Sequence, residues 1–343
     1  MNSIHYPYLV EHNKYQELLC TSLEKKGFKV VKVEKSIFKL LKYCIFSKIE
    51  ILHFHWLHGI TNSQGKVKTF FRIFLFIFCI IIWKIKSKKI IWTIHNLSSH
   101  DNKRKQIENF FYIFVSFFSD FLIVHSKLAV PKVSRKYKIK DNKIRYIPHG
   151  NYSSLINLER KDYSRNSKKF VFLFFGLIRP YKGVLGLLES FKRINIKAYL
   201  TIAGLCKSDN LNKNIIKTID SDKRIKYINK FIDEKQLNEL VLNSDVVVLP
   251  YVDAFTSGSV VYALSACKPL ILPEFISYNE YSDESNTFIY NNKNFKQLDY
   301  ALLRAFNSNN LIEMGSDSYD KALNLDWDNI GKSVLDLYLE ALN

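Results

Sequence analysis

Short apolar runs alternate with amphipathic stretches along the whole chain, a pattern typical of parallel strands with helices between them. In the first half, the candidate strands are Lys29–Val33, Ile49–Phe54, Lys89–Thr93, Phe121–Val124 and Ile144–Ile147. In the second half they are Phe170–Phe175, Lys197–Ala203, Ile225–Tyr227, Val246–Pro250 and Pro269–Leu272. The pattern predicts an α/β protein with two Rossmann-like, doubly wound sheets that meet at a cleft.

A polar stretch rich in Ser, Asn and Lys, from Asn151 to Lys169, separates the two halves. The chain has 343 residues, which exceeds one ordinary core and suits two domains. We expect an N-terminal domain over residues 1–155 and a C-terminal domain over residues 166–328. Residues 329–343 are expected to form a helix that can cross back to the first domain.

Histidines gather at the ends of the predicted strands in the first half. Open α/β sheets bind ligands beyond the carboxyl ends of their strands, so we expect these side chains to share a site. The polar and aromatic residues at these ends are His53, His55, Trp56, His58, His95, Asn96, His125 and His149.

His95 is the favoured catalytic base, because an imidazole titrates near neutral pH. The alternative is that His95 is locked onto the backbone and supports Asn96. Trp56 lies between His55 and His58, where its ring could stack on a ligand or be a buried structural residue.

Glycine is scarce, with 11 in the chain, so each one is expected to serve the backbone. Gly176 follows the strand Phe170–Phe175, and Arg179 and Lys182 precede a predicted helix at Val184–Phe191. A glycine turn, two cations and a helix start can cradle an anion. The alternative is an ordinary connecting loop with solvated cations.

A second candidate anion site follows the strand that ends at Leu249. Three hydroxyl residues and a glycine precede the predicted helix Val260–Ala266, and they are Thr256, Ser257, Gly258 and Ser259. Backbone N–H groups and the positive end of a helix dipole favour an anion there. Plain capping by Thr256 or Ser257 would need only one of them.

At these residues the chain resembles a known family, the GT4-like group of GT-B glycosyltransferases. The resemblance rests on Gly176 to Gly183, on Ser244 to Pro250, on Ala263 to Pro269, and on the junction Ile147-Pro148-His149-Gly150. It implies a GT-B fold, with a nucleotide-sugar donor in the C-terminal domain and an acceptor held mainly by the N-terminal one. We treat His55, Trp56, His58 and Asn96 as candidate acceptor contacts, with Trp56 able to stack on a sugar. The nucleotide-diphosphate sugar would be a substrate, and no cofactor is expected.

The chain departs from the family pattern at a pair of glutamates, of which the second holds the donor ribose. The corresponding positions here are Ala254 and Tyr262. The chain resembles a subgroup in which Thr-Ser-Gly replaces the first glutamate region. We name Asp253, Tyr262 and His149 as candidate contacts to the donor sugar or ribose, Asp253 being otherwise a solvated loop residue. The departure leaves the retaining or inverting outcome open.

Two Asp-x-Asp sequences resemble the manganese motif of the other major glycosyltransferase fold. Asp220-Ser221-Asp222 follows a probable helix at Leu211–Ile219, and Asp326-Trp327-Asp328 precedes one at Ile330–Leu342. In that other fold the motif ends a buried strand, so helix capping explains both sequences better. The five cysteines are scattered, without metal-ligand spacing, and indicate reduced thiols. We therefore expect metal-independent transfer.

The net charge of +19 belongs almost entirely to the first half. Residues 1–150 carry 27 Lys/Arg against 9 Asp/Glu, whereas residues 151–343 carry 24 against 23. A basic half indicates an anionic partner, either nucleic acid or an anionic membrane surface.

An apolar run, Ile73–Trp83, lies within this basic half. As a helix its eleven residues span about 17 Å, short of the roughly 30 Å of a bilayer core. It can be a buried core helix, or it can insert partly into the membrane interface beside flanking lysines. We favour membrane contact through residues 66–89 and 110–118. No apolar signal segment precedes it between Met1 and Leu19, so we expect a cytoplasmic protein on the inner face of the membrane.

These observations favour a peripheral-membrane glycosyltransferase of the hexosyltransferase type that acts on a lipid-linked or oligosaccharide acceptor in bacterial cell-surface polysaccharide synthesis, such as capsule, exopolysaccharide or O-antigen. A nucleotide-sugar epimerase of GT-B fold is one alternative, and it would need acidic catalytic residues. A basic nucleic-acid-binding protein is another, and it would need a recognition helix or an aromatic sheet surface. Because the basic residues flank apolar runs, no nucleic-acid partner is expected.

Overall fold

The computed structural model describes residues 2–9, 14–62, 65–98, 104–156, 169–220, 222–253, 255, 257–274, 281–291 and 296–343. The chain forms two compact units, Met1–Gly150 with Asp326–Asn343, and Asn151–Leu325. The C-terminal helix α13 (Trp327–Leu342) therefore belongs to the first unit. The N-terminal segment of the first unit ends at Gly150, five residues before the expected domain boundary at residue 155.

The first unit is built on a parallel six-stranded sheet with the order β2-β1-β3-β4-β5-β6. The chain moves outward from β1 to β2 and then continues from β3 on the other side of β1. The sheet therefore has a topological switch point between β1 and β3, where such sheets bind ligands. The strands are β1 (Asn2–Tyr6), β2 (Lys29–Lys32), β3 (Ile51–Phe54), β4 (Lys89–Thr93), β5 (Phe121–Val124) and β6 (Ile144–Tyr146).

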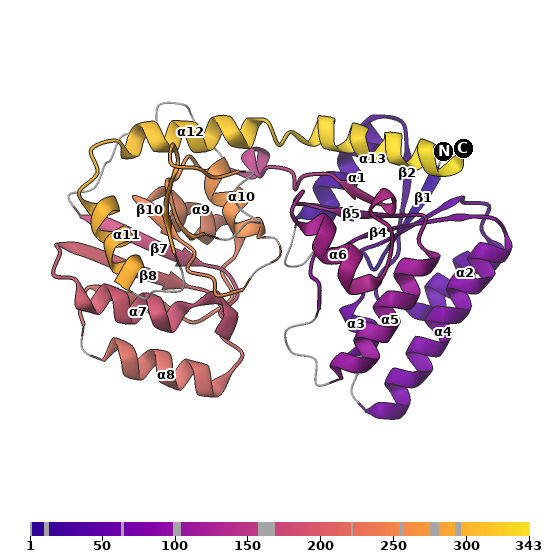
Figure 1. Ribbon diagram of the computed structural model, residues 1–343, viewed down its shortest axis with the longest axis horizontal. Coiled ribbons are helices and arrows are strands. Elements are labelled where there is room, and N and C mark those ends of the chain that lie inside the picture. The colour runs from indigo at the N-terminus through magenta and orange to yellow at the C-terminus, as the bar shows by residue number, and fades with distance from the viewer. Residues whose placement is uncertain are drawn as a thin grey trace. The chain divides into compact units, whose positions relative to one another are not determined.

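Helices cover both faces of this sheet (Figure 1). On one face, α1 (Tyr15–Lys25) and α13 pack over Ile51 and its neighbours in the core. On the other, Tyr6 and Phe54 contact Phe76 of α4. Strand side chains alternate between faces, so His5 and His53 must point toward α1 and α13. The other helices of this unit are α2 (Ile37–Phe46), α3 (His58–Thr61), α4 (Lys66–Ile85), α5 (Lys105–Phe118) and α6 (Ala129–Tyr137), with the short η1 (Asp141–Lys143).

The second unit repeats the design with the strand order β12-β11-β10-β7-β8-β9, again all parallel. The chain runs from β7 outward to β9 and then returns to β10 on the other side of β7. The switch point of this sheet therefore lies between β7 and β10. The strands are β7 (Phe170–Phe175), β8 (Ala198–Ala203), β9 (Ile225–Ile228), β10 (Val246–Val248), β11 (Leu270–Pro273) and β12 (Thr287–Tyr290).

Figure 1 shows the second sheet between two groups of helices. Helices α7, α8 and α11 pack together on one face, and α10 packs with α12 on the other. The helices of this unit are α7 (Val184–Arg193), α8 (Asp209–Ile219), α9 (Glu234–Leu242), α10 (Gly258–Ser265), α11 (Lys296–Phe306) and α12 (Leu311–Leu323), with η2 (Ser153–Leu155) and η3 (Pro180–Lys182).

All ten predicted strands are confirmed, with shifts of no more than two residues at their ends. Two further strands, β1 and β12, were not predicted. β1 reads Asn-Ser-Ile-His-Tyr, in which Ser3 and His5 are buried although they are polar. Ser3 and His5 interrupt the continuous apolar run that is typical of a strand buried on both faces, so β1 did not stand out in the pattern.

The apolar run predicted at Ile73–Trp83 is part of a longer helix. α4 has 20 residues, which correspond to about 30 Å. Its first three turns contain Lys66, Lys68 and Arg72. Among the described residues, no helix combines the length and apolar character needed to cross a membrane.

Candidate functional site

The loops after β7 and β10 lie together at the switch point of the second sheet. The two strands pair in parallel, with Val247 opposite Leu173, so the segments that follow them leave the sheet side by side. Gly176 has a φ of +111°, and a Cβ placed on it would lie 3.3 Å from Ser259 Oγ. The structure therefore brings together two of the predicted phosphate-binding residues that are 83 positions apart.

The backbones of these two loops also lie close together beyond Gly176. Gly183 has a φ of +70°, and a Cβ there would lie 1.9 Å from the carbonyl oxygen of Pro250. Val252 N donates to the carbonyl oxygen of Tyr181 at 2.8 Å. Each contact joins the Gly176–Gly183 segment to the loop after β10. Glycine at position 183 is thus required both by the left-handed backbone and by the lack of space.

A chain of polar contacts fixes the cation in this loop pair. Lys182 Nζ donates to Tyr251 Oη at 2.6 Å and lies 3.8 Å from the centroid of that ring. Tyr251 Oη is in turn 3.1 Å from Ser257 Oγ. Tyr251 is 1% exposed, and the sequence analysis did not single it out. Its position directly after Pro250 was the available signal, but a tyrosine after a buried strand is usually a packing residue.

The hydroxyl of Ser257 contacts Tyr251 in this series of polar contacts and does not cap the helix that follows. Ser257 is the N-cap residue of α10, and its side chain makes no capping hydrogen bond. The interpretation of Ser257 as a plain cap is therefore wrong. Gly258 and Ser259 form the first turn of α10, where backbone N–H groups and the helix dipole favour an anion. Thr256, predicted to join them, lies outside the described residues.

Arg179 borders a cavity of about 250 Å³ beside this loop pair. The walls are mainly apolar, and Arg179 is the charged residue among those that line the cavity. The cavity lies within the second unit and is smaller than a site that would enclose a whole nucleotide-sized ligand. Its other lining residues are Pro180, Gly183, Val184, Leu185, Gly186, Leu211, Pro250, Tyr251, Val252, Tyr290 and Leu298.

The candidate contacts to sugar and ribose occupy different environments. Asp253 is exposed in the loop after β10. Tyr262 is only 6% exposed, its ring contacts Tyr152 and Phe175, and its hydroxyl donates to Asn238 Oδ1. His149 lies in the first unit, where its Nδ1 donates to the carbonyl oxygen of Gly150 at 2.7 Å. The structure thus does not gather these three residues within one unit.

The predicted histidine group of the first unit is real and includes a member that the sequence analysis missed. His5, at the end of β1, is fully buried, and its Nδ1 lies 3.1 Å from His55 Nε2. His55 Nδ1 lies 3.4 Å from His95 Nε2. His5 was missed because β1 was missed. It lies at the switch point between β1 and β3, beside His53 of the neighbouring strand.

Aromatic rings enclose the imidazoles. Trp56 stacks on His95 with ring centroids 3.9 Å apart and an interplanar angle of 12°. Tyr15 of α1 contacts the rings of His95, His125 and others edge-on. The predicted acceptor residues His55 and Trp56 therefore adjoin the predicted base. His58 is half-buried at the start of α3, and Asn96 is exposed.

Burial keeps these imidazoles neutral at physiological pH. It lowers the pKa of His5 and His125 to about 3 and that of His149 to about 4. Burial, assisted by the neighbouring histidines, also lowers the pKa of His95 well below its usual value. A neutral imidazole offers one donor and one acceptor nitrogen, so His95 can accept a proton only from a strongly activated group.

A metal site was tested against the same residues. Among the described residues, His5, His53 and His55 could offer ligand nitrogens, which lie within 4.8 Å of one another. These nitrogens are engaged in hydrogen bonds with each other and with neighbouring side chains. The arrangement therefore fits a hydrogen-bonded cluster better than a set of open ligands.

Both Asp-x-Asp sequences make local contacts, and the predicted helix capping is confirmed for Asp326. Asp326 caps α13 by accepting from the backbone N–H groups of Asp328 and Asn329. Asp222 pairs with Arg224 at 2.8 Å. Asp220 ends α8 with a φ of +50°. Ser221 lies outside the described residues.

Comparisons with known proteins agree with this geometry. The family model for glycosyl transferases group 1 matches residues 156–317, which is most of the second unit. The GDP-mannose:glycolipid 4-beta-D-mannosyltransferase of Xanthomonas campestris pv. campestris is 24% identical over 309 residues, which cover 88% of this chain and 83% of that protein.

Several solved structures share the architecture across the whole chain. Anabaena HepE in complex with UDP and glucose aligns with a TM-score of 0.77 at 12% identity, covering 99% of this chain and 100% of that one. Sucrose-phosphate synthase from Thermosynechococcus elongatus aligns with a TM-score of 0.77 at 14% identity, covering 99% and 98%. WaaG, a glycosyltransferase involved in lipopolysaccharide biosynthesis, gives 0.67 at 11%, covering 98% and 99%. The chain therefore has the GT-B fold, and its residues 156–317 match the glycosyl transferases group 1 family.

Proposed function

We propose that this protein transfers a hexosyl group from a nucleoside-diphosphate sugar to a lipid-linked saccharide at the inner face of a bacterial cell membrane, in the synthesis of a cell-surface polysaccharide. The observation that carries the proposal is the contact between the two loops at the switch point of the second sheet. In this contact Lys182 hydrogen-bonds to Tyr251, which contacts Ser257. Gly176 lies beside Ser259 in the same pair of loops. The resemblance to a mannosyltransferase that uses GDP-mannose and a glycolipid supports the same substrate classes.

In this proposal the loop pair stabilises the leaving diphosphate. Arg179 offers a planar fork of donors and Lys182 offers a point charge, while the N-terminus of α10 adds backbone N–H groups. Charge develops on the diphosphate as the glycosidic bond breaks, so donors fixed beforehand lower the barrier. These groups belong to the chain itself, and we propose that transfer proceeds without a metal ion.

His95 acts on the acceptor in this proposal. Its neutral imidazole accepts a hydrogen bond from the attacking hydroxyl and takes the proton as that oxygen bonds to the sugar. Because burial lowers the pKa of His95, the proton moves only once the hydroxyl has become acidic, late in the transfer. Trp56, stacked on His95, holds the ring plane, and His55, His58 and Asn96 stay candidate acceptor contacts.

The test replaces cations at the second sheet one at a time. Lys182→Met and Arg179→Met are expected to lower kcat for hexosyl transfer roughly a hundredfold, the usual effect of losing one donor to developing charge. Lys230→Met is the matched control, because Lys230 is an exposed lysine in the loop after β9 of the same sheet. GDP-mannose is the first donor to assay, and its binding is measured by thermal stabilisation. Unchanged turnover and binding in both variants would refute the diphosphate site.

The epimerase alternative is tested in the same assay. Donor incubated without acceptor is expected to return with its sugar unchanged. Recovery of a second nucleotide-sugar epimer would support the alternative and contradict transfer as the main activity.

Membrane contact is supported by an exposed apolar face on α4. Five residues follow one another at helical spacing on this face and are 40–77% exposed. We call them the apolar stripe, and they are Phe70, Phe74, Phe78, Ile81 and Ile85. The opposite side of α4 buries Phe76, Ile80 and Trp83 in the unit. Helix α2 packs beside α4 and carries two further exposed phenylalanines, Phe38 and Phe46. An apolar surface of this kind on a soluble unit marks a binding face.

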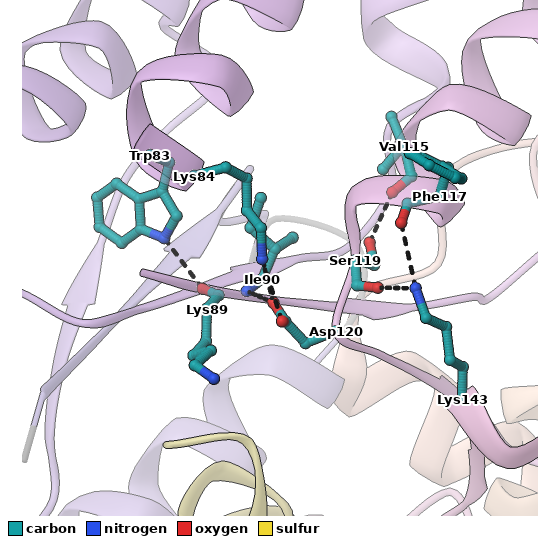
Figure 2. A network of polar contacts seen from close by, with 9 residues as sticks. All are labelled: Trp83, Lys84, Lys89, Ile90, Val115, Phe117, Ser119, Asp120 and Lys143. Atoms are coloured by element: carbon teal, nitrogen blue, oxygen red, sulfur yellow. Dashed lines mark hydrogen bonds and ion pairs between the residues drawn. The ribbon is translucent and has the colours of Figure 1, made fainter. Parts of the chain in front are cut away.

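Several lysines expected to meet lipid are used within the protein. Lys84 Nζ pairs with both carboxylate oxygens of Asp120 at 2.9 and 3.0 Å (Figure 2). Lys143, which lies outside the expected membrane segments, donates in a similar way to the carbonyl oxygens of Phe117 and Ser119. Lys86 and Lys88 donate to backbone carbonyls at the end of α2 and just beyond it. The apolar stripe must therefore supply much of the membrane affinity, with Lys66 and Lys68 left exposed at the start of α4.

Vesicle sedimentation tests this surface. Binding to phosphatidylglycerol vesicles is expected to fall about tenfold in Phe74→Ser, because an exposed phenyl ring contributes about 1.5–3 kcal/mol on full burial. Lys68→Ala is expected to lose about 1 kcal/mol, and only on anionic vesicles. Ile312→Ser, at an exposed isoleucine on α12 of the second unit, is the control. Self-association through the stripe without vesicle binding would contradict the membrane assignment.

A further inference from the structure

The buried imidazoles of the first unit form a continuous chain of hydrogen bonds, which we call the histidine chain. Its links are Thr93 Oγ1 to His53 Nε2 at 2.7 Å, His53 Nδ1 to Tyr338 Oη at 2.6 Å, Tyr338 Oη to His5 Nε2 at 3.1 Å, His5 Nδ1 to His55 Nε2 at 3.1 Å, and His55 Nδ1 to His95 Nε2 at 3.4 Å. Five of these residues come from three adjacent strands and the loops after them. Tyr338 comes from α13, at the other end of the sequence.

Such a chain has a direction. A neutral imidazole carries one proton, so one nitrogen donates and the other accepts. If His55 donates to His95, then His5 must donate to His55, and so on back along the chain. Where the single phenolic proton of Tyr338 is donated within the chain and not to the neighbouring Ser3, two arrangements satisfy every link. Either all four histidines carry their proton on Nδ1, or all four carry it on Nε2.

Burial makes these the relevant states. His5, His53 and Tyr338 are 0% exposed, so a charged or unpaired group among them would be costly. A mixed chain would place two donors or two acceptors face to face, which loses a hydrogen bond in a low-dielectric interior. The chain is therefore expected to reverse as a unit.

The hydroxyl of Tyr338 holds a special place in the chain because it joins two imidazoles. It is fixed there by the attachment of α13: Ser22 Oγ donates to the carbonyl oxygen of Trp327 at 2.6 Å, and a Cβ on Gly331 would lie 2.0 Å from Ser22 Oγ. The helix cannot shift toward α1 or turn without breaking this close contact. The geometry of Tyr338 is thus set by tertiary packing and not by the strands that carry the histidines.

We propose that Tyr338 is a positioning residue that determines, through His5 and His55, which nitrogen of His95 carries the proton. When the chain donates toward His95, its proton lies on Nδ1 and its Nε2 accepts. When the chain donates away from His95, the proton lies on Nε2 and Nδ1 has the lone pair that a base requires. The consequence for catalysis rests on the proposed role of His95, whereas the coupling of the tautomers does not.

The first experiment uses the unaltered protein. Nitrogen-15 spectra of the ring nitrogens report the tautomer of each histidine. His5, His53, His55 and His95 are expected to share one tautomer, whichever it is. His125 and His149 serve as internal standards, because each donates from Nδ1 to a backbone carbonyl, at 2.8 and 2.7 Å. Opposite tautomers at His5 and His55, or at His55 and His95, would overturn the proposal.

The second experiment removes the hydroxyl alone. Tyr338→Phe keeps the ring and is expected to give His95 a mixture of tautomers. It is also expected to lower kcat roughly ten- to hundredfold, the usual effect of losing a group that orients a functional imidazole, with the donor KM unchanged. Tyr6→Phe is the matched control: Tyr6 is also fully buried, on β1, and its hydroxyl has no hydrogen-bond partner among the described residues. It should leave both readouts unchanged.

The outcomes separate the two proposals. An altered His95 tautomer with unchanged kcat would support the histidine chain and contradict the role of His95 as a base. An unchanged tautomer in a folded Tyr338→Phe protein would overturn the chain. Metal analysis of the purified protein adds a third check, since one zinc per chain on His5, His53 and His55 would require their lone pairs and break the shared order.

Discussion

The two units share one architecture but place different kinds of residue at the switch points of their sheets. Each has a parallel six-stranded sheet with a switch point beside its first strand. All nine histidines and all four tryptophans lie in the first unit, and the second unit has neither. At its switch point the first unit gathers buried neutral imidazoles and aromatic rings. The second gathers glycines, hydroxyls and a cation held by Tyr251.

The proposed roles of the two sheet edges would account for this difference. A loop that approaches an anion through its backbone needs positions without side chains, which glycine supplies at 176 and 183. A cluster that handles a proton needs groups that change protonation, and burial sets their pKa. The stability of the second unit should therefore be sensitive to side-chain atoms added at its glycines. The stability of the first unit should be sensitive to protonation of its histidines.

Acid is expected to separate the two units most strongly. Unfolded histidines titrate near pH 6.5, whereas folded His5, His125 and His149 titrate near 3 to 4 because they are buried. Between these values the unfolded state binds more protons, so stability is complete above pH 6.5 and is lost as the pH falls. Each of these histidines is expected to cost the first unit roughly 2 kcal/mol at pH 5.

Tryptophan fluorescence reports this loss selectively, because every tryptophan is in the first unit. Hydrogen exchange of peptides from both units, corrected for the intrinsic rate at each pH, supplies the comparison. The second unit is expected to change little between pH 7 and 5. In that unit the hydrogen bond from Lys321 lowers the pKa of Asp283 to about 2, so this ion pair persists at pH 5. Equal loss of protection in both units would contradict the histidine explanation.

A single methyl group is expected to have the next largest effect. Gly183→Ala should destabilise the second unit by about 2–4 kcal/mol, because it combines a left-handed backbone with a collision against Pro250. Urea unfolding followed by hydrogen exchange locates the loss.

Gly27→Ala provides the control for the backbone contribution. Gly27 has a similar φ of +77°, but nothing lies within 4 Å of an added Cβ. Its cost is expected to be about 1 kcal/mol, in the first unit. A similar cost for both variants would mean that the loop after β10 moves aside, which would weaken the argument for a rigid phosphate site.

Tyr262→Phe separates packing from ribose binding at the second unit. Loss of the hydrogen bond to Asn238 is expected to cost about 1–2 kcal/mol and to change the donor KM little. Tyr227→Phe removes a comparable bond, from Tyr227 Oη to Asn212 Oδ1 at 2.8 Å, and serves as control. A raised donor KM in Tyr262→Phe alone would instead support the ribose assignment made from the sequence.

The smallest expected effect concerns the start of α13 in the first unit. Asp326→Ala should cost about 1 kcal/mol through the lost cap, and Asp328→Ala less than that. Neither should change the donor KM. If transfer by the unaltered protein depended on added manganese, and if both variants lost that activity, Asp326-Trp327-Asp328 would be identified as a metal site.

Local patterns predicted most of the scaffold. The strands β4, β5 and β7 were predicted with their observed bounds, since a buried parallel strand is a short apolar run whatever surrounds it. The two-unit division was predicted from the length of the chain and from the polar stretch between its halves. The contacts of the lysines at the end of α4 could not be predicted, because a lysine that reaches Asp120, as Lys84 does, has the same local sequence as one that faces solvent.

The sequence by itself determined the two sheets, the glycine and hydroxyl loops of the second unit, and the concentration of histidine in the first. Tertiary structure alone decided which of these residues meet. Tyr338 reaches His53 across 285 positions and His5 across 333, and Tyr251 reaches Lys182 across 69. Such contacts depend on strand order and helix packing, which bring distant residues together, whereas hydrophobic periodicity records only whether each residue faces the core or the solvent.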